Sequence, residues 1–415
     1  MSRLAASLAL LALAACNSPT PPGPAKPASD RSATTPETPA KAATPEAPPD
    51  EHIRRGSKAG PPRPRVLPEA VACPVDTYPP AASLSAMYAA NDVASVRAAY
   101  VGTPLQEIIK TSDTATGRSD DATIVKALED PTEAAQTAAT TAIQSAMSQW
   151  MRHNLKIAAE DPDPARHPPA WTAARCAWEH GLHVLGVDLQ SRAGELSSEA
   201  DRGDASIADD IDDLFKADPA DPRQIKPARQ AIEKTWFRIV HRELAATAAF
   251  AREHESVATA RRALGLFHML RDRLQDRNTP AIATIEAQLS GKPSAIDVPA
   301  IMRQIDVALI KRARKYCSEA VDPKLHGNPD GAASVKEGET YTKLLLPAMR
   351  TALAAQKFDA AAYMTTWQAF AEAVDSADDV DEIKKHSDEL VHWNCALQQS
   401  LGIRECTSSA DEAPR

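Results

Sequence analysis

Three side chains in the segment ARCAWEHGLHVLGVDLQSR, residues 174–192, have the chemistry to bind a metal ion. Cys176, His180 and His183 lie at spacings of four and three residues. Because successive residues of an α-helix are rotated by about 100°, this spacing puts the thiol and both imidazoles on one helical face. Thiolate and imidazole groups are ligands of transition metals and of haem iron. The face is therefore a candidate metal site.

A second segment near the C-terminus, SDELVHWNCALQQSLG at residues 387–402, has the same geometry. It places Asp388, His392 and Cys395 on one face, again at spacings of four and three. Two such helices facing each other would supply enough ligands for a transition metal or a haem. The sequence has no CxxCH motif, which excludes covalently attached c-type haem.

Both segments also carry an apolar stripe on the side opposite these polar groups. The stripes consist of Trp178, Leu182, Leu185 and Leu189, and of Leu390, Trp393, Leu397 and Leu401. Such stripes are typical of helices that pack one face against a core. The Cys and His residues are therefore equally well explained as partly buried structural residues.

The N-terminus has the features of an export signal. Arg3 precedes an uncharged apolar run over residues 4–15, which is too short to span a bilayer as a helix. The run ends in LAAC at residues 13–16, which resembles the lipobox of bacterial lipoproteins. The resemblance implies cleavage before Cys16 and acylation of that residue, so that several acyl chains anchor the protein. Asn17, in place of the Asp typical of inner-membrane retention, implies the outer membrane, with a periplasmic or a surface-facing orientation.

The next segment, residues 17–68, is rich in Pro, Ala, Thr, Ser and Lys and almost lacks large apolar residues. It cannot bury enough surface to offset the entropy of ordering, so we expect a disordered tether. Five basic residues cluster within residues 52–65. They would attract anionic lipid or cell-wall polymer, or simply form a solvated linker.

The cysteines compete with the metal hypothesis. With Cys16 acylated, the remaining thiols are Cys73, Cys176, Cys317, Cys395 and Cys406. Disulfides form in the oxidising compartment to which the signal leads. Cys395 and Cys406 are expected to form a local bridge, and Cys73 would pair with either Cys176 or Cys317. The odd count leaves one thiol free. Because disulfides at Cys176 and Cys395 would remove a ligand from both candidate faces, we favour disulfides over metal.

Beyond the tether, apolar residues recur at spacings of three and four, as in Ile232, Trp236, Ile239, Val240 and Leu244. Aromatic residues make up 4% of the chain, Gly is rare, and long alternating β-branched runs are absent. This pattern predicts an all-α fold. Pro227 and Pro299 are expected to open long helices.

The helical region contains internal repeats. TARRALGLFHMLRDRLQDR, which begins at residue 259, aligns without gaps with the segment at 174, so that His183 matches His268. At nearly the same offset, Trp150 matches Trp236, and a weaker copy begins at Ser334. Amphipathic units that cannot bury their apolar faces alone must pack on one another. We therefore predict a duplicated helical bundle or a short α-helical repeat array.

The sequence accordingly predicts four segments. They are a signal peptide at 1–15, the lipidated Cys16 with its linker at 16–68, a helical domain with repeats of about 85 residues at 69–406, and a flexible tail at 407–415.

The architecture has a faint similarity to exported imelysin-like proteins, duplicated helical bundles linked to iron uptake. Their motif has a His preceded by Gly and followed three residues later by Glu. Here His241 follows Val240, and Glu243 is only two residues on. The motif is broken, so the resemblance implies a helical bundle and carries over neither the site nor a hydrolase activity.

Catalytic signatures are absent from the sequence. It has no nucleophile elbow, phosphate-binding Gly-rich loop or HExxH motif. The excess of acidic residues, 56 Asp and Glu against 47 Lys and Arg, argues against a nucleic-acid-binding surface. We expect a non-enzymatic, lipid-anchored protein whose helical repeats bind an envelope protein, a cell-wall component or another ligand, without a cofactor. The alternative is a metal- or haem-binding periplasmic protein with an imelysin-like role in metal uptake.

Overall fold

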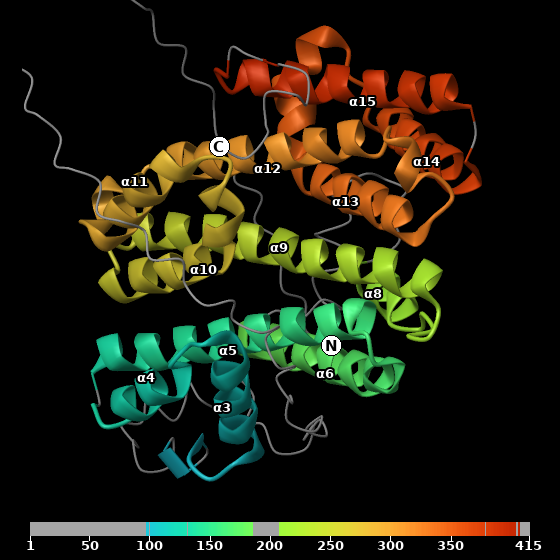
Figure 1. The fold of residues 1–415 in the computed structure, drawn as a ribbon. Helices are drawn as coiled ribbons and strands as arrows, with labels where there is room; N and C mark the ends of the chain where they lie inside the picture. Colours follow the sequence, from blue (N-terminus) through green and yellow to red (C-terminus); the bar gives the residue numbers. More distant parts are fainter. Residues whose placement is uncertain are drawn as a thin grey trace, which may run out of the picture. The chain divides into compact units, whose positions relative to one another are not determined.

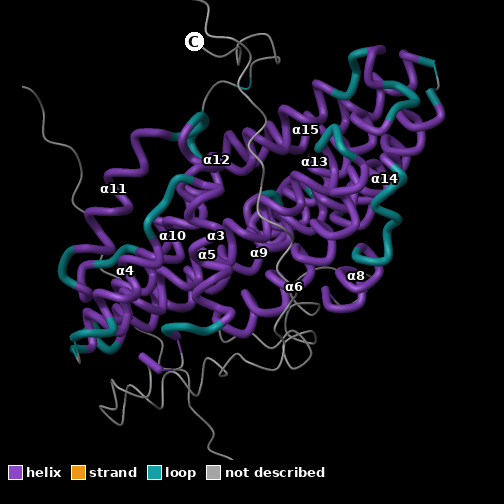
Figure 2. The backbone as a smooth tube through the Cα atoms, turned by 60° about the horizontal axis from the view of Figure 1, so that its bottom comes forward, coloured by secondary structure: helices purple, strands orange, loops and turns teal. Residues whose placement is uncertain are grey.

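The computed structural model describes residues 97–98, 100–130, 132–185, 207–377, 379–403 and 406. Throughout these ranges the regular secondary structure is helical, without strands (Figures 1 and 2). The prediction of an all-α fold is confirmed. The predicted signal peptide, the acylated Cys16, the linker, Cys73 and the tail at 407–415 lie outside the described residues.

The helices differ widely in length. The α-helices are α3 (Pro104–Thr116), α4 (Asp120–Ala127), α5 (Glu133–Glu160), α6 (His167–Leu185), α8 (Ile207–Leu214), α9 (Pro222–Glu253), α10 (Val257–Gln275), α11 (Thr279–Ser290), α12 (Val298–Glu319), α13 (Pro329–Ala352), α14 (Ala360–Ser376) and α15 (Val380–Ser400). Four short 3-10 turns lie between them, η2 (Pro164–Arg166), η3 (Pro293–Ala295), η4 (Pro323–Leu325) and η5 (Ala354–Gln356).

The long helices form hairpins that pack in series. Helices α5 and α6, α9 and α10, α12 and α13, and α14 and α15 are the paired members. The second helix of each hairpin also packs on the first helix of the hairpin before it, so that α10 contacts α5, α13 contacts α9, and α15 contacts α12. Figure 1 accordingly shows α9 between α5 and α13. This arrangement is a short α-helical repeat array.

Helices aligned by the sequence comparison occupy equivalent places in the hairpins. Helices α6, α10 and α13 are all second members, whereas Trp150 and Trp236 lie on the first members α5 and α9. The aligned Leu185 and Leu270 are both buried. In contrast, the side chain of His268 is 47% exposed. The repeated leucines are therefore core residues, whereas this histidine is a surface residue.

Asp residues begin several of these helices. The side chains of Asp221 and Asp297 accept hydrogen bonds from backbone N–H groups in the first turns of α9 and α12. Pro299 lies in the first turn of α12, as expected. The expectation for Pro227 is wrong, because it lies inside α9. The Asp221 cap, followed by Pro222 in the first turn, starts this helix five residues earlier.

Two tryptophan–glycine contacts set the distance between neighbouring hairpins. A Cβ atom on Gly181 of α6 would lie 2.7 Å from the Trp236 ring, and one on Gly338 of α13 would lie 2.5 Å from the Trp367 ring. Both indoles are fully buried. In each case the second helix of one hairpin meets the first helix of the next. Only glycine lets the helix approach the indole this closely.

We expect the substitution Gly338→Ala to lower the free energy of unfolding by about 1–2 kcal/mol, because the cost of overpacking exceeds alanine's gain in helix propensity. Urea unfolding followed by circular dichroism measures the change. Trp367→Leu makes room for the added methyl group. The double variant should therefore lose less stability than the sum of the losses in the two single variants. A Gly338→Ala variant more stable than the parent would contradict the close contact.

Candidate functional site

The first predicted metal face lies on α6. Cys176 is buried and disulfide-bonded, and its partner lies outside the described residues. The side chains of His180 and His183 also lie outside what the structure describes. Trp178, on the predicted apolar stripe, is buried and packs edge-on against Trp236. The stripe is thus a core contact, and the thiol on the other side is not available as a thiolate.

The second predicted face lies on α15. The side chain of Asp388 is 64% exposed and forms an ion pair with Lys384. His392 is exposed and lies edge-on to Trp393. Cys395 is joined to Cys406 by the predicted local disulfide, with their Cα atoms 5.4 Å apart. Asp388 and Cys395 therefore each have a partner other than a metal.

The two faces do not meet. Helices α6 and α15 lie at opposite ends of the hairpin array, with α5, α9 and α12 between them (Figure 1). Within the described ranges, no three His, Cys, Asp or Glu residues are grouped so that they could hold a metal ion. With Cys176 and Cys395 both in disulfides, the metal or haem hypothesis loses the two thiolates on which it depended.

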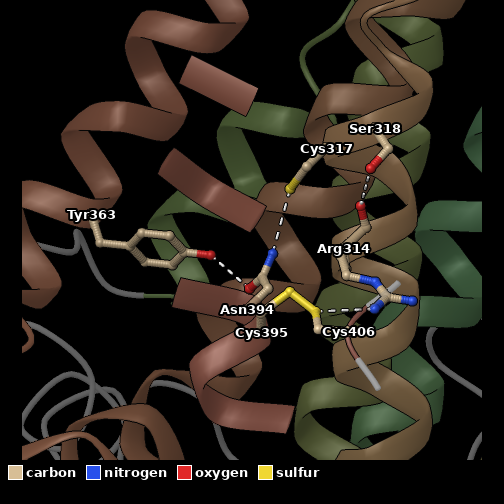
Figure 3. Close-up of a disulfide and its surroundings, with 7 residues drawn as sticks. All are labelled: Arg314, Cys317, Ser318, Tyr363, Asn394, Cys395 and Cys406. Atoms are coloured by element: carbon tan, nitrogen blue, oxygen red, sulfur yellow. Dashed lines mark hydrogen bonds between the residues drawn. A yellow bond between two sulfur atoms is a disulfide. The ribbon is translucent and has the colours of Figure 1, made fainter. Parts of the chain in front are cut away.

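Of the two pairings left open for Cys73, the structure excludes the one with Cys317. Cys317 on α12 is a free thiol and is fully buried. Its S–H donates to the carbonyl of Ala313 at 3.3 Å. Its sulfur accepts from Asn394 Nδ2 at 3.4 Å (Figure 3). The hydroxyl of Tyr363 donates to the oxygen of the same amide at 2.7 Å. Burial raises the pKa of Cys317, which keeps it a protonated structural residue.

These contacts also shift the predicted apolar stripe of α15. Leu390 and Leu397 are buried as expected, but Trp393 is only partly buried. Asn394 and Gln398 are fully buried instead. The polar contacts of Asn394 with Cys317 and Tyr363 compensate for burying an amide at this position.

Charged residues gather where three hairpins meet. We call the following set the central ionic cluster: Arg152 of α5, Glu233 and Lys234 of α9, Asp272 and Arg273 of α10, and Glu337 of α13. Its three cations surround the buried ring of Phe237. The guanidinium carbons of Arg152 and Arg273 lie 5.3 and 5.0 Å from the ring centroid, and the Lys234 ammonium lies 6.0 Å from it. This geometry permits cation–π attraction from several sides of one aromatic ring.

The carboxylates bridge these cations in turn. Glu233 accepts from Arg152 at 2.8 Å and from Lys234 at 2.9 Å. Asp272 accepts from Arg152 at 2.8 Å and from Arg273 at 2.6 Å. Glu337 lies 3.0 Å from the Lys234 ammonium. Three positive charges thus face three negative charges.

The cluster is ionised despite its burial. Burial opposes the ionisation of Glu233, but Lys234 and Arg152 outweigh it and hold the pKa of this carboxyl well below its usual range. Burial likewise opposes the charge on Lys234, but Glu233 and Glu337 raise its pKa. The charges of opposite sign pair with one another. We therefore interpret the cluster as a structural contact that holds the three hairpins together.

A similar pairing accounts for the His241 segment. His241 Nε2 lies 3.0 Å from Asp306 Oδ1, and both side chains are mostly buried. The contact joins α9 to α12. His241 is thus paired across the two helices, in keeping with the broken motif seen in the sequence.

A polar groove of about 600 Å³ lies along the first half of α12. Its lining residues are Asn278, Asp297, Pro299, Ala300, Arg303, Gln304, Val307, Lys311, Leu401 and Ile403. Arg303 and Lys311 form no ion pair with any described residue and donate instead to the backbone carbonyls of Leu401 and Arg277. The carboxylate of Asp297 accepts from the N–H of Ala300. The groove thus combines two cations without carboxylate partners with an apolar wall.

Sequence reasoning missed both the cluster and the groove. A signal for the cluster was present, because Glu233 and Lys234 lie one turn before Trp236 and Phe237 on a helix with a strong apolar stripe. Residues of the cluster that bond to each other are up to 120 residues apart in the chain, as in the Arg152–Asp272 bond. No local pattern joins residues that far apart.

The chain matches no model of a known protein family, no curated protein and no solved structure. Among the described helices, none is both long enough and apolar enough to cross a membrane.

Replacing Lys234 by Met should lower the free energy of unfolding at pH 7 by about 3–5 kcal/mol, because two buried carboxylates lose the cation that they share. The loss should be smaller at pH 4, where a carboxyl group freed from Lys234 can take up a proton. In the parent, the depressed pKa of Glu233 contributes stability above the ordinary carboxyl pKa of about 4.3, and this contribution is lost as the pH falls through the folded-state pKa.

Urea unfolding at both pH values measures these changes. Lys384→Met is the matched control, because Lys384 pairs with Asp388 on the exposed surface. It should leave stability unchanged at either pH. An equal loss in the two variants would show that the cluster has no special role.

Cys317 should resist alkylation in the native protein and react once the protein is unfolded, because its thiol is buried and protonated. Mass spectrometry of the peptide that contains Cys317, after iodoacetamide treatment with and without denaturant, measures this difference. Cys406 after mild reduction serves as the comparison, because it is only partly buried. Rapid native labelling of Cys317 would contradict the packing shown in Figure 3.

Proposed function

We propose that this protein is a lipid-anchored component of the bacterial outer membrane whose helical repeat array binds a partner protein or ligand without catalysing a reaction. The observation that carries the proposal is the contrast between the central ionic cluster and the groove on α12. In the cluster, charges of both signs are paired within the protein. In the groove, Arg303 and Lys311 form no ion pair with a described carboxylate and donate to backbone carbonyls instead. Charges without a partner are the natural contacts for a second molecule.

The architecture supports a binding role. Repeat arrays have extended surfaces on which a partner can lie, and their stability comes from contacts between neighbouring units. The LAAC motif at residues 13–16 adds the anchor, and the Pro- and Ala-rich residues 17–68 add a tether. Together these features describe a binding domain held near a membrane surface.

The anchor and the binding role are tested in the same cells. A Cys16→Ser variant of the full chain should move from the membrane fraction to the soluble fraction and lose the mass of its acyl chains, as measured by fractionation and mass spectrometry. A photo-crosslinking amino acid at Ala300, in the groove, should join the anchored protein to a defined envelope partner.

The same crosslinker at Ala361, which is exposed at the start of α14 and outside the groove lining, is the matched control and should give no adduct. An acylated protein that gives no specific adduct at Ala300 would refute the binding role while leaving the anchor intact. A Cys16→Ser variant that stays in the membrane fraction would refute the anchor.

A further inference from the structure

We propose that the groove along α12 binds an extended acidic peptide in which two carboxylates, four residues apart, flank an apolar residue. The inference rests on the proposed function, because it names the chemistry of the partner at that site. It follows from the positions of two cations, from the donors that they still have, and from the apolar surface between them.

The spacing of the cations matches an extended chain. Arg303 and Lys311 are eight residues apart on α12, which corresponds to about 12 Å along the helix axis. A strand rises about 3.3 Å per residue, so residues four apart lie about 13 Å from each other and point to the same side. Two acidic side chains at this spacing can reach both cations at once.

Both cations keep hydrogen-bond donors for a ligand. Arg303 donates Nε and Nη2 to the carbonyl of Leu401, at 3.1 and 2.6 Å, which leaves Nη1. Lys311 donates one proton to the carbonyl of Arg277 at 3.0 Å, which leaves two. Their backbone partners are carbonyls at or just beyond the C-terminal ends of α15 and α10. These contacts fix the positions of the cations without neutralising them by a carboxylate.

The wall between the cations is partly apolar. Val307 lies on α12 midway between Arg303 and Lys311, and Leu401 and Ile403 line the same groove. In the extended peptide, the residue between the two acids points to the same side as they do and would contact this wall. The side-chain amide of Gln304, which lines the groove, would form hydrogen bonds with the peptide backbone.

The charge of the groove selects against a basic ligand. Its single lining carboxylate, Asp297, already accepts a hydrogen bond from the N–H of Ala300 at the start of α12. The nearby carboxylates of Asp276 and Asp306 are paired with Arg312 and His241. A carboxylate of the ligand would therefore lie near two cations and one anion, Asp297, which already accepts a hydrogen bond.

Fluorescence anisotropy of the full chain with labelled, end-capped peptides tests the inference. The peptide ESLSE should bind saturably at low ionic strength and more weakly as salt is added. The peptide EESLS, which has the same composition but adjacent acids, and the peptide KSLSK should bind more weakly, by about two- to fivefold for each exposed ion pair lost.

The charge reversal Lys311→Glu should weaken the binding of ESLSE by at least about fivefold. Lys292→Glu is the matched control, because Lys292 is exposed, lies outside the groove lining and changes the net charge equally. It should leave ESLSE binding unchanged, and circular dichroism checks that both variants are folded.

Equal binding of ESLSE and EESLS, equal effects of the two lysine variants, or no saturable binding of ESLSE would each overturn the inference. If ESLSE shows no saturable binding but Ala300 forms a crosslink in cells, the acidic-peptide inference is refuted and the proposed binding function stands. Absence of both would refute the two together.

Discussion

The central ionic cluster is the interaction on which the arrangement of the hairpins depends. Six charged side chains from α5, α9, α10 and α13 pair with one another, and the three cations among them lie near the ring of Phe237, so three successive hairpins share one set of ionic contacts. Burying charges is costly, and apolar residues of similar volume would often give equal stability. What the charges add is geometry, because the bonds of Arg152 to Glu233 and Asp272, and of Lys234 to Glu337, form only when the helices that carry them meet in register. The cluster therefore helps to specify how the repeats stack, together with the tryptophan–glycine contacts between hairpins.

The cations of the groove on α12 are held differently from those of the central ionic cluster. In a chain with a net charge of −9, a cation usually finds an acidic neighbour, and most of the described Lys and Arg residues near α9 and α10 do so. Arg303 and Lys311 donate to backbone carbonyls instead. This difference separates cations that pair with carboxylates inside the array from cations that backbone carbonyls hold along α12.

The sequence predicted those features that depend on local periodicity. The apolar positions of α9, such as Trp236 and Val240, and the repeated Leu185 and Leu270 are buried as their spacing indicated. The disulfide between Cys395 and Cys406 could also be predicted, because the two residues are close in the chain. The free, buried state of Cys317 could not be predicted, because its burial depends on Asn394, 77 residues away. The cluster and the groove also join distant segments, and helical periodicity carries no information about which faces of different helices meet.

The contacts of Trp236 with Gly181 and of Trp367 with Gly338 constrain how such an array can evolve by duplication. Each contact is divided between two neighbouring units, with the glycine at the end of one and the indole at the start of the next. A copied hairpin can be inserted without a gap or a clash only if it brings an indole that fits the glycine before it and small residues that suit the hairpin after it. The junction between hairpins is therefore the part that selection has to preserve. A repeat boundary placed between two hairpins would divide that junction.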